Sequence, residues 1–168
     1  MAFVRDRARV HPHSAAEADP VYRRILVPLS ADPESLHALP SACSLAAPDR
    51  GSLVGVFVIE LPTELPLEAH MFDAERRARE ALEHARAEVE AYGLRFSGRL
   101  VRAHGAAEAI IAEAERLTVD LIVLAARRRP SRRLHAPLFD EVVRDVLADA
   151  PCRVMVITPP PDGADDGH

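Results

Sequence analysis

The chain has 168 residues, enough for one domain with a substantial core and too few for two comfortable domains. Hydrophobic residues make up 48% of it and aromatic residues only 4%, so we expect a core of Val, Leu, Ile and Ala. A net charge of -5 gives no broad electrostatic reason to expect a nucleic-acid partner. No apolar run approaches the roughly 18 residues that span a bilayer, and the first residues lack the apolar core of a signal peptide. We therefore expect a cytoplasmic protein without a membrane span.

The two ends of the chain differ in composition from the segment between them. Residues 1–21 begin basic and show no apolar periodicity, and residues 159–168 are rich in Pro and Asp. Such segments bury too little apolar surface to offset the entropy lost on ordering. We therefore predict a flexible arm, one domain over residues 22–158 and a disordered tail. Cys43 and Cys152 each stand alone in an apolar segment, which is typical of small buried residues in a reducing compartment.

The first elements of the domain are a strand and a helix. Residues 24–29 form an apolar, β-branched run that predicts a buried strand. Asp32 or Ser30 can cap the helix that follows, with Pro33 at its first position. Pro40, inside that helix, predicts a kink because proline lacks an amide hydrogen.

The clearest helix covers residues 73–92 and stops at Gly93. Glu75 and Arg79 are spaced as an i,i+4 ion pair and are expected on its solvent face. The inner face is marked by apolar residues at helical intervals: Ala78, Leu82, Ala85, Val89 and Tyr92. Four further strands are expected over residues 52–60, 94–101, 120–125 and 153–157. Two further helices are expected, one opening at Gly105 and one over residues 138–149.

Strands that are apolar on both faces and alternate with helices indicate a parallel sheet covered on both sides. With right-handed crossovers, the prediction is a doubly wound α/β fold with five parallel strands in the order 3-2-1-4-5. Ligands of such sheets bind beyond the carboxyl ends of the strands, where the strand order reverses. That point lies between the loops after the first and fourth strands.

The loop after the fourth strand is the most informative stretch of the chain. It lies where this type of α/β unit holds a phosphate, yet it has no glycine to let backbone amides converge on an anion. It carries instead five arginines: Arg127, Arg128, Arg129, Arg132 and Arg133. These could clamp an anion, lie in solvent as a basic loop, or dock an acidic partner or membrane surface. No stacking aromatic residue accompanies them, so they are weak evidence for nucleic acid.

From Tyr22 to Thr158 the chain resembles the universal stress protein family. The resemblance is carried by ILVPLS in the first strand, VGVFVIE in the second, HGAAEAI, DLIVLAARRR, and FDEVVRDVLADAPCRVMVI at the end. The segment ELPTELPLEA is also similar to the stress-protein domains of some amino-acid permeases.

In nucleotide-binding members of the family, the resemblance implies an Asp after the first strand and a G-x2-G-x9-G-[ST] signature after the fourth. In this chain the Asp position is Ser30 and the valine near adenine is kept as Val58. The first two glycines fall on Ala125 and Arg128, and the last pair falls on Asp140 and Glu141. Essentially every polar or glycine element of the signature is therefore replaced.

Asp140 and Glu141 fall in the first turn of the last helix, where a bound phosphate would otherwise lie. Carboxylates there stabilise a helix terminus by about 0.3–1 kcal/mol each. An incoming triphosphate would meet their negative charge instead of free amides. We therefore interpret the phosphate position as already taken by carboxylates of the chain itself. His104 and His135 follow strands near this point, but no acid is spaced to make either a general base.

The last strand offers an interface. Val154, Met155, Val156 and Ile157 form a short apolar run that is expected at a sheet edge, which invites pairing with another chain. The resemblance implies the same, since such domains commonly form homodimers through this strand.

These observations predict a stress-protein-like regulatory or protective domain that acts through an unidentified protein partner and binds no ATP in the usual way. It is not expected to be an enzyme, to need a cofactor or to hold a metal. One alternative is a sensor of ATP, AMP, cyclic AMP or another anion that uses the arginine loop, with at most slow ATP hydrolysis. Another is a cytosolic accessory regulator of a transporter, suggested by the permease-domain likeness.

Overall fold

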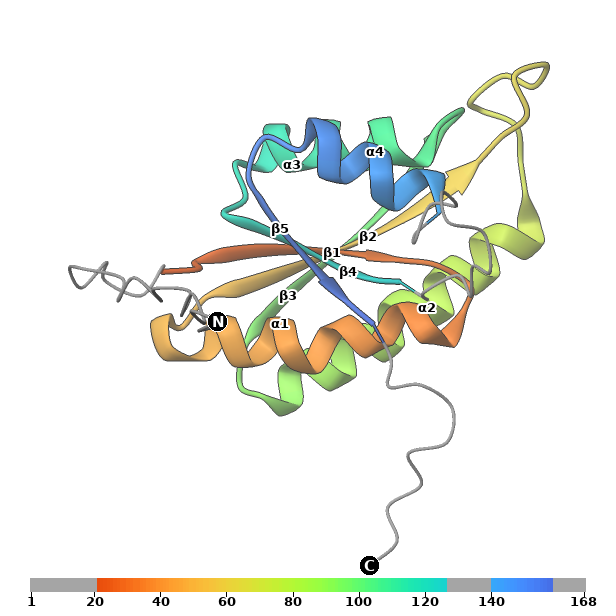
Figure 1. Cartoon of the computed structure of the whole chain (residues 1–168). Coiled ribbons are helices and arrows are strands. Elements are labelled where there is room, and N and C mark those ends of the chain that lie inside the picture. Colours follow the sequence, from red (N-terminus) through yellow and green to blue (C-terminus); the bar gives the residue numbers. More distant parts are fainter. Residues whose placement is uncertain (1–20, 127–139, 159–168) are drawn as a thin grey trace, which may run out of the picture.

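A computed structural model describes residues 21–126 and 140–158 of the chain (Figure 1). Five strands form one sheet in the order β3-β2-β1-β4-β5, with every neighbouring pair parallel. The strands are β1 (Arg24–Leu29), β2 (Ser52–Glu60), β3 (Arg95–Ala103), β4 (Leu121–Ala125) and β5 (Arg153–Ile157). The predicted fold class and strand order are therefore confirmed. The predicted arm and tail lie outside the described residues, apart from Val21.

Helices cover both faces of the sheet (Figure 1). One face carries the 3₁₀ helix η1 (Pro33–His37), α1 (Ala38–Ala46) and α2 (Phe72–Ala91), with the short 3₁₀ helix η2 (Ala47–Asp49) after α1. The other face carries α3 (Ala106–Leu117) and α4 (Glu141–Asp149). No described helix has the length and apolar character that crossing a membrane requires.

The central strand β1 supplies both halves of the core. Ile25, Val27 and Leu29 pack into the cluster beneath α1 and α2, whereas Leu26 packs into the cluster beneath α3 and α4. Successive side chains of a strand point to opposite faces, so a strand buried on both sides must be apolar throughout. This is why the run from Arg24 to Leu29 could be recognised as a buried strand.

The segment after β1 begins as a 3₁₀ helix and not as a kinked α-helix. The Asp32 carboxylate caps it by accepting a hydrogen bond from the Glu34 amide at 3.1 Å, and Pro33 follows at its first position. The α-helix proper begins at Ala38, so Pro40 lies in its first turn. Amides of that turn have no partner within an α-helix, and proline is tolerated there.

The α2 helix ends as predicted at Gly93, which has a positive φ of 72°. Tyr92 was expected on its inner face and is instead 47% exposed. Its φ and ψ of -82° and 0° place it at the helix C-cap, where the chain leaves the helix before the side chain reaches the core. Leu82 is half-buried against the core, and Ala78, Ala85 and Val89 are buried.

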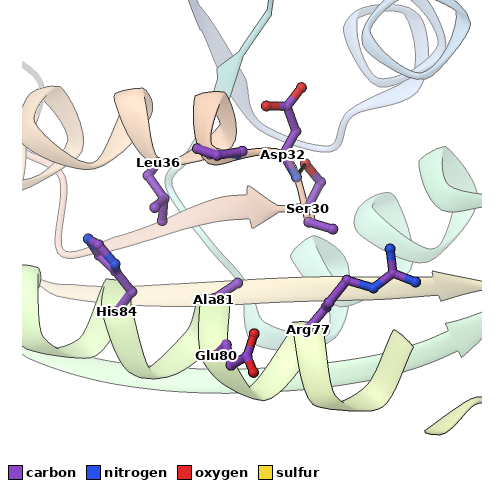
Figure 2. A pocket seen from close by; sticks show the side chains of 9 residues that line it. Ser30, Asp32, Leu36, Arg77, Glu80, Ala81 and His84 are labelled. Carbon is purple, nitrogen blue, oxygen red and sulfur yellow. Dashed lines mark hydrogen bonds between the residues drawn. The ribbon is translucent and has the colours of Figure 1, made fainter. Parts of the chain in front are cut away.

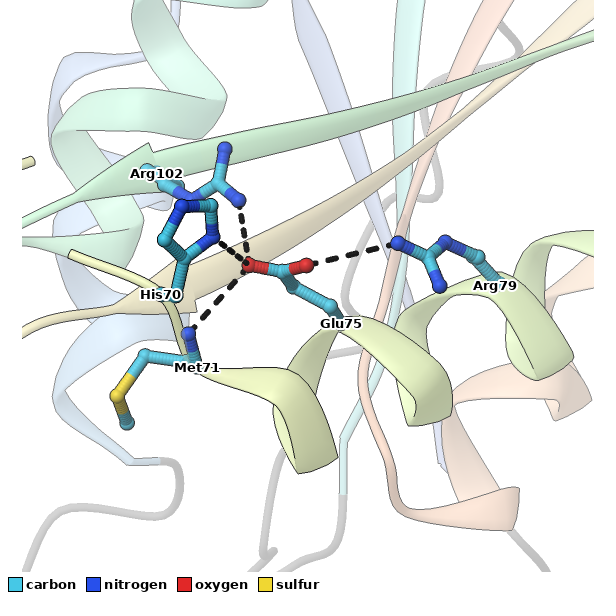
Figure 3. A network of polar contacts seen from close by, with 5 residues as sticks. All are labelled: His70, Met71, Glu75, Arg79 and Arg102. Atoms are coloured by element: carbon cyan, nitrogen blue, oxygen red, sulfur yellow. Dashed lines mark hydrogen bonds and ion pairs between the residues drawn. The ribbon is translucent and has the colours of Figure 1, made fainter. Parts of the chain in front are cut away.

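Glu75 was expected on the solvent face of α2, and this prediction is wrong. Its side chain is buried at the carboxyl end of the sheet, with the residue only 7% exposed (Figure 3). One carboxylate oxygen lies 2.6 Å from Nη2 of Arg102 on β3, and the other lies 3.5 Å from Nη2 of Arg79. The predicted pair with Arg79 therefore exists, but the partner that holds Glu75 in the core comes from another element.

Two more groups complete the contacts of this carboxylate (Figure 3). The Met71 amide donates to it at 3.4 Å, and Nδ1 of His70 lies 3.8 Å away. The hydrogen bond from Arg102 is the largest cause that lowers the pKa of Glu75 below its ordinary value of 4.5, and Met71 and His70 act in the same direction. The buried carboxylate thus joins the loop after β2, the start of α2 and the end of β3.

The lowered pKa of Glu75 predicts a specific dependence of stability on pH. A carboxyl whose folded pKa lies below its unfolded value stabilises the fold above the unfolded value and loses that contribution as the pH falls through the folded one. Below pH 4.5 the free energy of unfolding of the parent should therefore fall more steeply with pH than that of Glu75→Gln. Urea titrations from neutral pH to about pH 3 measure both slopes.

Glu83→Gln is the matched control, because it removes an exposed carboxylate from the same helix. It should keep the acid slope of the parent. Equal slopes for Glu75→Gln, Glu83→Gln and the parent would show that the network of Glu75 does not contribute to the acid dependence.

Candidate functional site

The candidate site lies where β1 and β4 run side by side. These strands pair in parallel at Ile25 with Leu121 and at Leu26 with Ile122. From β1 the chain continues toward β2, and from β4 it continues toward β5 on the other side. The connections that follow β1 and β4 therefore lead to opposite sides of the sheet, which is the switch point of a doubly wound sheet and the place where ligands bind in such folds.

A hollow of about 210 Å³ lies between these loops. It brings together Ser30, Ala125 and Asp140, three of the six positions that the family resemblance singled out. Its described lining also includes residues that the sequence had not assigned to a site, among them Ser35 and Ala126, and the full set is Ser30, Asp32, Glu34, Ser35, Ala125, Ala126 and Asp140.

The other predicted positions fall into three groups. Glu141 is the first residue of α4 and is exposed beside Asp140. Val58 is half-buried on β2 and packs against the core beneath α3 and α4, and it is not among the residues that line the hollow. Arg128 and the anion-binding candidates Arg127, Arg129, Arg132 and Arg133 lie outside the described residues.

Asp140 is the N-cap of α4. Its backbone is extended, with φ -69° and ψ 174°, and its Oδ1 accepts a hydrogen bond from the Val143 amide at 3.0 Å. The first amides of a helix have no partner within the helix and are the donors that bind a phosphate. In this chain a side-chain carboxylate already occupies one of them, and Glu141 places a second negative charge in the same turn.

The loop after β1 is tied together by its own polar groups. The Ser30 amide donates to Oγ of Ser35 at 3.1 Å, and the Asp32 amide donates to Oγ of Ser30 at 3.2 Å. Oγ of Ser35 in turn donates to the Asp32 carbonyl at 2.9 Å. Ser35 stands three residues after the capping Asp32, a spacing that could have indicated a local side-chain to backbone bond.

The chemistry of the hollow is acidic and hydroxylic. The side chains of Asp32, Glu34 and Asp140 lie in its lining with two serines. Its volume is below the about 300–1,000 Å³ of ordinary ligand pockets. Within residues 21–126 and 140–158, no group of three or more His, Cys, Asp or Glu side chains is arranged to hold a metal ion.

A second hollow, of about 330 Å³, opens on the other side of Ser30 and Asp32 (Figure 2). One wall is the loop after β1 with Pro33 and Leu36, and the other is α2. Arg77, Glu80 and His84 come from α2, and their side chains surround an apolar centre (Figure 2). The mixture of both charges around apolar atoms resembles a surface that contacts a protein side chain more than one that holds a single anion.

The remaining candidates are His104, His135 and the last strand, and His135 lies outside the described residues. Nδ1 of His104, which follows β3, lies 3.1 Å from the carbonyl of Leu61, so the ring is held by the backbone that follows the neighbouring strand β2. Strand β5 is an edge of the sheet, as predicted. Its Val154 and Val156 pack toward α3 and α4, and Met155 and Ile157 pack toward α1 and α2, which leaves the four side chains half-buried.

A model of the universal stress protein family matches residues 21–158. No protein with a curated description matches the chain. Among solved structures, a universal stress protein family protein from Burkholderia pseudomallei is 26% identical, with a TM-score of 0.61, and the match covers 81% of this chain and 96% of that one.

Two further structures of similar fold contain nucleotides. A universal stress protein in complex with cAMP is 17% identical, with a TM-score of 0.64 and coverage of 83% of this chain and 98% of that one. A universal stress protein from Archaeoglobus fulgidus in complex with dAMP is 18% identical, with a TM-score of 0.63 and coverage of 82% and 99%.

The cap of α4 can be tested by substitution at Asp140. Asp140→Ala removes the acceptor of the Val143 amide and should lower the free energy of unfolding by about 0.5–2 kcal/mol. Asp140→Asn keeps an acceptor and should lower the free energy of unfolding much less than Asp140→Ala does, because Asn and Asp are similar N-caps. Urea denaturation measures both, and an equal loss in the two variants would argue against a capping role.

Proposed function

Because the chain belongs to the universal stress protein family, we propose that it is a regulatory or protective domain that acts through protein contacts. It does so without binding ATP in the way implied by the glycine-rich signature, and without a catalytic role. The observation that carries this proposal is the Asp140 carboxylate bound to the Val143 amide at the start of α4. A cytoplasmic location is part of the same proposal.

The physical reason is competition for the same donors. A phosphate binds at a helix terminus because free amides point at it and the helix dipole favours negative charge. Here Asp140 uses one of those amides, and Asp32 adds a second carboxylate to the lining of a hollow of about 210 Å³. A triphosphate would have to displace the cap and enter against these carboxylates, so we infer a different kind of partner.

The contacts of the second hollow support a protein partner. It combines apolar atoms of Pro33, Leu36 and Ala81 with exposed charges of both signs on α2. Protein interfaces use this combination of an apolar centre and a polar rim. The transporter-regulator alternative is one form of such an interaction, and it rests on the permease-domain likeness of the sequence alone.

A nucleotide or anion sensor is the second candidate. It is supported by the fold neighbours that contain cAMP and dAMP. In this chain the arginines at 127–129, 132 and 133 would have to supply positive charge, because the described lining of the hollow contains no basic residue, and they lie outside the described residues. The two candidates differ in whether a nucleotide stabilises the protein.

Thermal unfolding in the presence of nucleotides separates them. A ligand that binds only the native state at about 100 times its Kd adds about 2.7 kcal/mol of stability. Under the main proposal, millimolar ATP, AMP and cyclic AMP each leave the Tm of the parent unchanged. A rise in Tm that disappears in R128A/R129A but persists in R76A/R86A would overturn it in favour of the sensor, since the control pair removes exposed arginines of α2.

We also propose a homodimer that pairs through the edge strand β5. Val156→Glu should convert the dimer to a monomer, because it places a charge without a partner at a half-buried position of the pairing strand. Val156→Thr is the matched control, since it keeps the β-branched shape without a charge and should remain dimeric. Sedimentation velocity measures the mass, and circular dichroism confirms that both variants are folded. A monomeric parent would contradict the proposal.

A further inference from the structure

The amino end of the sheet carries a row of polar side chains that the site at the carboxyl end does not use. Arg24 on β1 pairs in register with Ser52 on β2, and Ser52 pairs in register with Arg95 on β3. Residues paired in this way across parallel strands point to the same face of the sheet. Arg24, Ser52 and Arg95 therefore form one transverse row, with a hydroxyl between two guanidinium groups.

The next row of paired residues identifies the face of the sheet on which Arg24, Ser52 and Arg95 lie. Leu26, Val54 and Ser97 are paired across β1, β2 and β3 two residues further along. Leu26 and Val54 belong to the core beneath α3 and α4, so both rows lie on the α3 side of the sheet. A groove of about 330 Å³ opens there, and its lining includes Arg24, Ser52, Val54, Arg95, Ser97 and Leu117.

The groove concentrates positive charge in a chain whose net charge is -5. Arg95 is exposed and makes no side-chain hydrogen bond or ion pair within the described residues. Arg24 donates one Nη1 hydrogen to the Leu117 carbonyl, which anchors its guanidinium beside the end of α3 and leaves other donors of the group available.

The nearby acidic groups are already engaged. Glu113 on α3 pairs with Arg99 at 2.6 Å and with Arg116 at 2.7 Å, so two guanidinium groups share its single charge. The Asp120 carboxylate accepts the backbone amides of Arg23 and Arg24 at 2.9 and 2.8 Å. Arg24 and Arg95 thus place two positive charges at the groove against the one negative charge of Asp120, which its amide partners do not neutralise.

We propose that this groove binds a small tetrahedral oxyanion, either free phosphate or the phosphate of a small monoester. Neighbouring strands are about 4.8 Å apart, so the Cα atoms of Arg24 and Arg95 are about 10 Å apart, with Ser52 between them. Two arginine side chains across that gap can converge on one anion with their planar forks. The Ser97 hydroxyl supplies a further donor, whereas Oγ of Ser52 already donates to the Arg23 carbonyl at 3.4 Å; Val54 and Leu117 supply an apolar boundary.

This site is separate from the hollow between β1 and β4. Strand β2 is nine residues long, or about 30 Å at 3.3 Å per residue, and the two sites lie at opposite ends of the sheet. The binding of an oxyanion at the amino end can therefore be tested whether or not a nucleotide binds at the carboxyl end.

The experiment titrates the full chain with inorganic phosphate, at constant ionic strength, and follows backbone amide shifts by NMR. The expected result is saturable shifts at Ser52 and Ser97 that weaken about tenfold or more in Kd in Arg95→Ala, because a hydrogen bond to a charged group contributes about 1.5–3 kcal/mol. Arg95→Gln is the second variant, in case alanine perturbs the start of β3. A small monoester such as glycerol phosphate, run in parallel, distinguishes free phosphate from an esterified ligand.

Arg144→Ala is the matched control, since it removes one exposed arginine of α4 and should leave the phosphate Kd unchanged. Three outcomes would overturn the proposal. These are the absence of saturable shifts with both ligands, shifts confined to residues at the carboxyl ends of the strands, and the same Kd in the parent and both Arg95 variants.

Discussion

The structure depends on the burial of β1 between two parallel neighbours. Each backbone amide and carbonyl of this strand must find a partner on β2 or β4, because helices exclude water from both faces. Ile25 and Leu26 have register partners on both sides, and their side chains enter opposite halves of the core. Since the strands on either side of β1 are reached by crossovers in opposite directions, the same constraint that stabilises the fold opens a gap at its carboxyl end.

The described residues at that gap bond mainly to groups of the chain itself. The scaffold presents the start of α4 to the gap, and the exposed amides of any helix start require partners. Here the chain supplies one from its own side chain, Asp140, and ties the facing loop together through Ser30, Asp32 and Ser35. Fold and ligand are separable in principle, and in the described part of this gap Asp140, Ser30 and Ser35 bond to neighbouring backbone groups. This separation explains why a likeness of fold to nucleotide complexes carries little weight for the ligand.

The fold could be predicted because its signals are local. An apolar run marks β1, a glycine with positive φ marks the end of α2, and Gly105 stands at the N-cap of α3. The errors arose where distant residues meet. The helical spacing around Glu75 predicts a surface residue. Its buried position depends on Arg102, which lies 27 positions away in the sequence and is brought beside it by β3. The row of Arg24, Ser52 and Arg95 likewise exists only through strand register, which no single segment of sequence encodes. Within the candidate site, the sequence placed Asp140 in the first turn of the last helix, and the structure makes it the N-cap one residue before α4. The place of Val58 in the core depended on packing.

The two edges of the sheet differ in length and in chemistry. β5 is a short apolar strand, whereas β3 is nine residues long and carries Arg95, Arg99 and Arg102. Charged side chains along an edge discourage the approach of another strand, and a sheet that can pair at both edges can extend without limit. An association restricted to β5 would be self-complementary and would close at two copies. The arginines of β3 would then prevent pairing at the other edge of the sheet and so keep the protein from forming fibres.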